Sequence, residues 1–191
     1  MDDSPCFCLL CSPPSEGPAW DERDSRISAS VTDFGWHVMG VGAGDEAPAD
    51  WAYSIGLWHT LRSPEICVFG LRVETMMPII NTAGAEIRDG RPLEAEQVRD
   101  DILNGYSVAV RPVHPSWYRD FFGAGLDFYQ APPLPLMQLF WPDKAGRFPW
   151  DDEAEQYCRA LQPLLWVPKT ETTGPWTGLD QVGCFMPDLG K

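Results

Sequence analysis

The stretch from Trp51 to Leu71 constrains the fold more than any other part of the chain, because it is the densest run of aromatic, glycine and apolar residues. Residues 51–57 and 65–71 each have the length and composition of a β-strand, and the polar segment 59–64 between them has the composition of a loop. The simplest interpretation is a pair of adjacent strands in the middle of a sheet.

The first of these strands is predicted to have one bulky and one nearly bare face. Side chains alternate along a strand, which places Trp51, Tyr53, Ile55 and Leu57 on one face and Ala52, Ser54 and Gly56 on the other. A bare face lets another backbone or a ligand approach closely, most closely at Gly56. Packing of a helix is the ordinary interpretation of such a face, and a bound ligand is the alternative.

The remaining elements predict a single α+β domain. We expect strands at 34–42, 106–113 and 136–141, helices within 18–32, 75–90 and 92–104, and short helices at 117–122 and 151–161, with a turn at 123–125. Because strands and helices do not alternate strictly, we expect a mainly antiparallel sheet of about five or six strands with helices packed on one face. The domain is expected to span residues 18–169, between a cysteine-containing extension (1–17) and an irregular tail (170–191).

The charge of the chain restricts its partners. Twenty-eight acidic against 14 basic residues give a net charge of −14, which argues against binding to nucleic acid or to an anionic membrane. A small molecule, a cation or a basic protein partner suits it better, and a role in solubility alone is the alternative. No apolar run approaches the ~20 residues of a membrane span, and the N-terminus lacks the features of a signal peptide. A cytoplasmic location is therefore expected.

Three of the six cysteines, Cys6, Cys8 and Cys11, lie close together near the N-terminus. The cysteines are too few and too unevenly spaced for a small disulfide framework. Three neighbouring thiolates can hold a soft cation such as zinc, although zinc ribbons usually have two or more residues between their paired cysteines. A fourth ligand would come from far along the chain, from Cys67, Cys158, Cys184, His37, His59 or His114. Buried or unligated thiols are the alternative.

No nucleophile elbow, metal-protease histidine pair or glycine-rich phosphate loop is present. An enzyme must then rely on residues that the fold brings together. The candidates are His37, Ser54 and Glu65 as catalytic groups, with Tyr53 beside them, in a pocket that could hold a flavin or another cofactor. This hypothesis requires that at least two of these side chains lie within hydrogen-bonding distance and that one has a strongly shifted pKa.

Several short motifs resemble those of a known family. They are Phe34-Gly35-Trp36, the run 52–57, Pro64-Glu65-Ile66 with Phe69-Gly70-Leu71, Trp141-Pro142-Asp143 with Gly146, and Phe148-Pro149-Trp150. Together with the cysteine-containing lead-in, they make residues 6–166 resemble the uncharacterised bacterial family called domain of unknown function 4262. Ser54 stands where the family usually has threonine, and Ser63 where many members have histidine. The family name implies no activity.

The leading functional hypothesis is a non-catalytic binding protein, immunity-like or antitoxin-like in one form. Nine tryptophans are many for one chain, and several lie near predicted strand ends, where they could line a pocket or an interface. The expected binding residues for a small molecule or basic protein are Trp36, Tyr53, Gly56, Trp58, His59, Trp141 and Asp143. The enzyme described above and metal binding through the N-terminal cysteines are the two alternatives.

Overall fold

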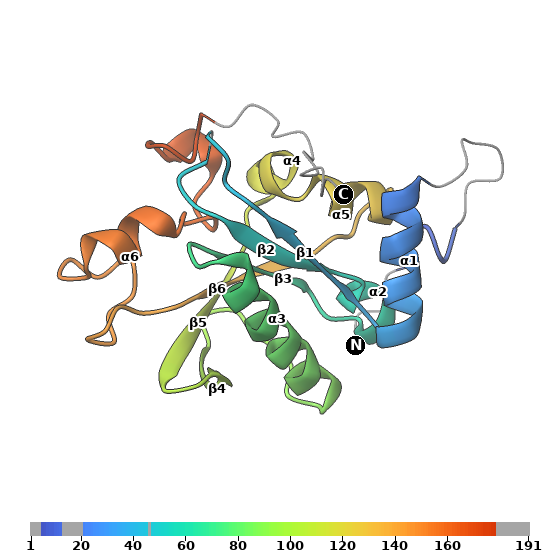
Figure 1. Cartoon of the computed structure of the whole chain (residues 1–191), viewed down its shortest axis with the longest axis horizontal. Coiled ribbons are helices and arrows are strands. Elements are labelled where there is room, and N and C mark those ends of the chain that lie inside the picture. The colour runs from blue at the N-terminus through green and yellow to red at the C-terminus, as the bar shows by residue number, and fades with distance from the viewer. Residues whose placement is uncertain (1–4, 13–20, 46, 179–191) are drawn as a thin grey trace, which may run out of the picture.

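A six-stranded mixed sheet organises the chain. The computed structural model describes residues 5–12, 21–45 and 47–178 (Figure 1). The sheet has the order β1-β2-β3-β6-β5-β4, in which β3 and β6 run parallel and every other neighbouring pair is antiparallel. The strands are β1 (His37–Val41), β2 (Trp51–Ile55), β3 (Glu65–Phe69), β4 (Val98–Leu103), β5 (Tyr106–Pro112) and β6 (Leu136–Phe140). The predicted α+β class with a mainly antiparallel sheet is confirmed.

Helices cover both faces of the sheet, rather than the single face expected from the sequence. The helices are α1 (Glu22–Phe34), α2 (Leu57–Leu61), α3 (Val73–Arg88), α4 (Tyr118–Phe121), α5 (Gly123–Tyr129) and α6 (Gln156–Leu161), with 3₁₀ turns η1 (Pro115–Trp117) and η2 (Lys169–Glu171). Helix α3 packs on one face, and α1, α4 and α5 contribute to the core on the other (Figure 1). No described helix combines the length and apolar character needed to cross a bilayer.

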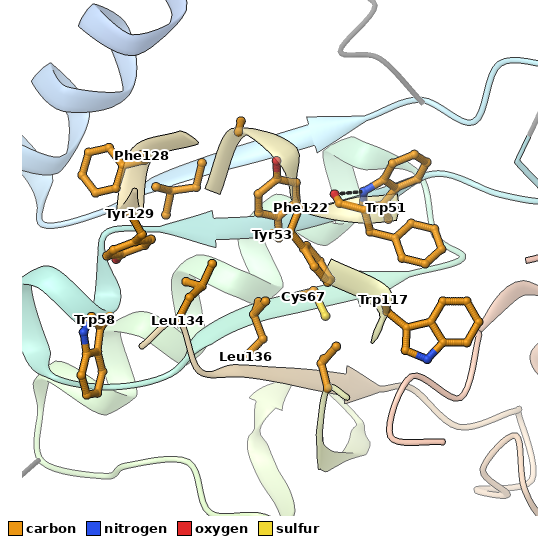
Figure 2. Close-up of a cluster of buried hydrophobic side chains, with 14 of the residues drawn as sticks. Trp51, Tyr53, Trp58, Cys67, Trp117, Phe122, Phe128, Tyr129, Leu134 and Leu136 are labelled. Atoms are coloured by element: carbon orange, nitrogen blue, oxygen red, sulfur yellow. Dashed lines mark hydrogen bonds between the residues drawn. The ribbon is translucent and has the colours of Figure 1, made fainter. Parts of the chain in front are cut away.

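Two buried clusters fill the space on the two sides of the sheet. The first core contains Trp51, Tyr53 and Ile55 of β2 together with aromatic residues of α4 and α5 (Figure 2). The second core contains Ala52 of β2 beneath the apolar stripe of α3. The bare side of β2 is therefore covered by a helix at Ala52, as the ordinary interpretation of the sequence predicted. Trp51 also donates its indole N–H to the carbonyl of Phe121 at 3.1 Å, which fixes α4 to the sheet.

Gly56 follows the last residue of β2 and has a backbone conformation that glycine favours. Its φ is +119°, in the left-handed region. A Cβ atom there would lie 2.7 Å from the Val31 side chain of α1 and 3.1 Å from backbone atoms of Gly35 and Trp36. The close approach predicted at Gly56 is thus made by α1 and the start of β1. The chain turns at this point from β2 directly into α2, so residues 57–61 are helical and only part of the predicted loop 59–64 is a loop.

The predicted helix at 92–104 is wrong, because residues 98–103 form edge strand β4. Strands β4 and β5 are joined through Asn104-Gly105, with Gly105 at φ +80°, and this Asn-Gly pair is a strong hairpin signal. A shift in register between Arg99 and Leu103 breaks the two-residue alternation. Arg99 and Ile102 are consequently both buried although three residues apart, a spacing that imitates a helix.

The predicted turn at 123–125 is also wrong, since these residues begin α5. Two glycines in three residues suggested a turn because glycine is a poor helix former. Helix α5 is short, and Ala124, Phe128 and Tyr129 bury their side chains in the first core. Packing on the sheet therefore outweighs the low helix propensity of this segment.

Replacing Gly84 by alanine is expected to destabilise the fold. A Cβ atom at this position in α3 would lie 2.7 Å from the ring of Trp36, which is held by a 2.9 Å hydrogen bond to Asn81. Overpacking costs about 1–3 kcal/mol, and the better helix propensity of alanine offsets about 1 kcal/mol of this. We expect urea denaturation to show a lower free energy of unfolding.

Gly123→Ala is the control, because no heavy atom lies within 4 Å of a Cβ built there. It should change the stability of the protein little. Equal stability of Gly84→Ala and Gly123→Ala would show that the Trp36 ring moves aside.

Candidate metal centre

Three cysteines and one histidine meet on the surface of the first core. Cys6, Cys8 and Cys11 come from the N-terminal segment (residues 5–12), and His59 comes from α2, 48 to 53 residues further on. The four ligand atoms all lie within 4.8 Å of one another. Nδ1 of His59 is 4.0 Å, 3.2 Å and 3.3 Å from the sulfurs of Cys6, Cys8 and Cys11, respectively.

The N-terminal segment is fixed in place by its backbone and by burial. Leu9 donates its N–H to the carbonyl of Phe128 in α5 at 2.9 Å. The carbonyl of Cys8 accepts from the N–H groups of Cys11 and Ser12, which curls the segment so that its sulfurs converge. Cys6 and Cys8 are buried in the first core, whereas Cys11 is exposed. Two of the three converging cysteines are thus buried residues, and the third lies at the surface.

A buried carboxylate positions the helix that carries His59. Glu65 opens β3 and accepts hydrogen bonds from the backbone N–H groups of Gly56, at 2.9 Å, and Trp58, at 3.1 Å. It also accepts from the hydroxyls of Ser54 and Tyr129. The Tyr129 oxygen in turn accepts from Gly56 N–H at 3.0 Å and from His59 N–H at 3.4 Å. We call these groups the Glu65 network; they fix the backbone of α2 at its first turn.

The carboxyl group of Glu65 is buried among hydrogen-bond donors. Burial raises the pKa of Glu65 above its ordinary value, and the hydrogen bonds from Ser54, Tyr129, Trp58 and Gly56 offset only part of this rise. All four partners donate to the carboxylate, so its oxygens need no proton to complete the network. Burial and the neighbouring Glu65 also raise the pKa of Tyr129, which keeps that hydroxyl protonated as a donor.

The cluster has the chemistry of a zinc site. Tetrahedral zinc with bonds of about 2.3 Å to sulfur and about 2.0 Å to nitrogen requires sulfur–nitrogen distances of about 3.5 Å. The three sulfur–nitrogen distances at His59, 4.0 Å, 3.2 Å and 3.3 Å, lie on both sides of this value. Burial and the positive charge of Arg62 lower the pKa of His59, which favours the neutral imidazole that binds metals. Burial raises the pKa of the Cys8 thiol to about 12, so a cation must displace its proton on binding.

The part of the chain that carries His59 matches a known protein family. Residues 30–155 match the family described as Domain of unknown function (DUF4262). The chain belongs to the DUF4262 family. The matched residues include His59 and the Glu65 network, whereas the three clustered cysteines precede the match. Comparison with curated proteins and with solved structures gave no match.

Of the residues proposed for catalysis in this DUF4262 protein, the structure brings two together. Ser54 donates to Glu65 within the Glu65 network. His37 lies on β1, where Nδ1 is 3.2 Å from the Ser30 hydroxyl of α1, and burial and Arg26 lower its pKa. Tyr53 lies in the first core with its ring edge-on to Phe122. The enzyme hypothesis therefore remains a prediction, with its four residues divided among different surroundings.

The predicted aromatic binding residues lie on both sides of the sheet. Trp36 and Trp141 belong to the second core, and Tyr53 and Trp58 belong to the first. Trp141 donates its indole N–H to the carbonyl of Phe69 at 2.8 Å. Their use by a ligand or a protein partner remains a prediction, while their packing accounts for their burial.

Asp143, another predicted binding residue, organises the loop after β6. It is buried and accepts hydrogen bonds from the N–H groups of Ala145, Arg147 and Glu155 and from the Arg147 guanidinium. Burial alone would raise the pKa of Asp143, but these hydrogen bonds outweigh it and lower the pKa to about 2.

Asp143→Asn is expected to destabilise the protein at pH 7 but much less near pH 2. The folded-state pKa of Asp143 lies below its ordinary value, so its contribution is present above about pH 4 and is lost as the pH falls toward 2. Thermal unfolding of Asp143→Asn and of the unmodified protein should show that the difference between their melting temperatures becomes smaller as the pH falls across this range. Asp45→Asn, at an exposed position, is the control. A difference that stays constant with pH would contradict the prediction.

Proposed function

We propose that this DUF4262 protein binds one zinc ion through Cys6, Cys8, Cys11 and His59, and that the ion fastens the N-terminal segment to the domain. The observation that carries the proposal is the convergence of three sulfurs and one imidazole nitrogen within 4.8 Å. Zinc sites with three cysteines and one histidine are closed, structural sites, because no coordination position is left for substrate. The ion would therefore act on stability and not on catalysis.

The surroundings of the cluster support a built site. Two separate parts of the chain contribute ligands, and each is held by hydrogen bonds of its own. The N-terminal segment is held by the Leu9–Phe128 hydrogen bond, and α2 is held by the Glu65 network. All five described cysteines are free thiols, so none of the three ligands is used in a disulfide with another described cysteine. Thiolate and imidazole donors together suit zinc better than magnesium or calcium.

Metal analysis of reduced, purified protein tests the proposal. We expect about one zinc ion per chain, and substitution by cobalt should give the absorption of a tetrahedral site with sulfur ligands. Cys8→Ser and His59→Ala should each lose most of the bound metal.

His114→Ala is the matched control, because His114 is an exposed histidine whose imidazole bonds to the nearby Ser116. It should retain full metal. Absence of zinc after reconstitution under reducing conditions, or full zinc in both Cys8→Ser and His59→Ala, would overturn the proposal.

A further inference from the structure

A second feature, distinct from the cysteine cluster, is an apolar cavity of about 540 Å³. It lies between α4, α5 and the proline-rich segment 130–135 that leads into β6. Its volume falls within the roughly 300–1,000 Å³ of small-molecule sites, which are mostly apolar with a few polar groups. Arg119 provides the only charged side chain among the described residues that line it.

The walls of the cavity present flat rings. Its lining includes Pro132, Pro133 and Pro135 of segment 130–135 and the partly exposed Tyr118 of α4. Burial raises the pKa of Tyr118 to about 12, so this wall carries no negative charge near neutral pH. Tyr129 also borders the cavity, but its side chain is buried in the first core and its hydroxyl is bonded in the Glu65 network. Flat apolar walls favour a planar ligand.

Arg119 differs from every other arginine of the chain. All eleven arginines lie in the described part, and the other ten each have an ion pair, a hydrogen bond, a ring contact or an electrostatic interaction with a described residue. Two acidic residues of the same helical region are engaged elsewhere: Asp120 pairs with Lys169 at 2.9 Å and Asp127 with Arg23 at 2.9 Å. The guanidinium of Arg119 thus has no counter-ion among the described residues.

From the cavity and this arginine together, we infer that the protein binds a small planar aromatic carboxylate between α4, α5 and segment 130–135. The ring of the ligand packs against the proline and tyrosine rings, and its carboxylate pairs with Arg119. The planar guanidinium matches a carboxylate with two parallel hydrogen bonds, which adds orientation as well as affinity. This site shares Tyr129 with the network behind His59 but uses none of the proposed zinc ligands.

Titration of the zinc-loaded full chain with 2-naphthoate and with the neutral 2-naphthalenemethanol tests the inference. We expect saturable binding of both at one site, with naphthoate bound more tightly. Arg119→Gln should weaken naphthoate roughly 10-fold or more and leave the alcohol unchanged. Ala131→Trp should abolish binding of both, because Ala131 is an exposed residue on the cavity wall and a large ring there fills the space without disturbing the core.

Arg72→Gln is the matched control, since Arg72 is an exposed arginine that pairs with the exposed Glu74 and does not line the cavity. It should bind both probes as the unmodified protein does. The inference is overturned if naphthoate shows no saturable binding, if Arg119→Gln binds it with unchanged affinity, or if Ala131→Trp binds it normally.

Discussion

Glu65→Ala is expected to lower the free energy of unfolding by about 3 kcal/mol or more, because it removes the shared acceptor of several buried donors. The substitution leaves three buried donors without this acceptor, the hydroxyls of Ser54 and Tyr129 and the N–H of Trp58. The N–H of Gly56 keeps the Tyr129 oxygen as its acceptor. Each unsatisfied buried donor carries a cost of about 1–3 kcal/mol, reduced where the structure relaxes or water enters. Urea denaturation followed by tryptophan fluorescence measures the effect.

Two further variants are needed for comparison. One distinguishes the effect of losing the carboxylate from the effect of losing side-chain volume, and the other is an exposed control. Glu65→Gln keeps the shape but replaces one acceptor oxygen by a donor group, so an intermediate loss is expected. Glu74→Ala, at an exposed glutamate of α3, should change stability little. If Glu65→Ala were as stable as Glu74→Ala, the Glu65 network would not be a source of stability.

Removal of zinc is expected to lower the free energy of unfolding by about 4 kcal/mol when free zinc had been near 1,000 times its dissociation constant. The proposed zinc ligands converge only in the folded chain, so the binding energy of the ion would contribute to folding. The N-terminal segment should lose its stability before the rest of the domain does. The amide of Leu9, which is bonded to Phe128, should exchange its hydrogen faster after chelation.

Cys8→Ser provides the decisive comparison for this prediction. The variant should resemble the chelated protein in stability, and a chelator should have no further effect on it. Chelation that destabilises Cys8→Ser and the unmodified protein equally would show that the chelator acts elsewhere. Unchanged exchange at Leu9 would show that the N-terminal segment is held without the ion.

The sequence predicted the strands that are buried and short, and it failed where local signals conflict with tertiary packing. Strands β2 and β3 were predicted because apolar runs of strand length are bounded by polar residues. Strand β4 was missed because its register shift places Arg99 and Ile102 on the buried side three residues apart. The Asn104-Gly105 turn was the signal that could have corrected this.

The sequence predicted the three cysteines of the candidate metal site but could not identify its fourth ligand. The spacing of Cys6, Cys8 and Cys11 indicated a metal site because the three thiols are necessarily near one another. His59 could not be chosen among six possible fourth ligands, because its position depends on the turn at Gly56 and on the Glu65 network. Arg119 gave no signal at all, since its lack of a counter-ion follows from pairings made by residues on other elements.

The single parallel pair in the sheet divides it into two halves with different folding requirements. Strands β1, β2 and β3 pair consecutively, as do β4, β5 and β6, so each half needs contacts only between neighbouring strands. The halves join where residues 65–68 of β3 meet residues 136–139 of β6. Closing this long loop carries an entropic cost that hairpins avoid. We expect the parallel pairing of β3 with β6 to form last and to set the folding rate of the whole chain.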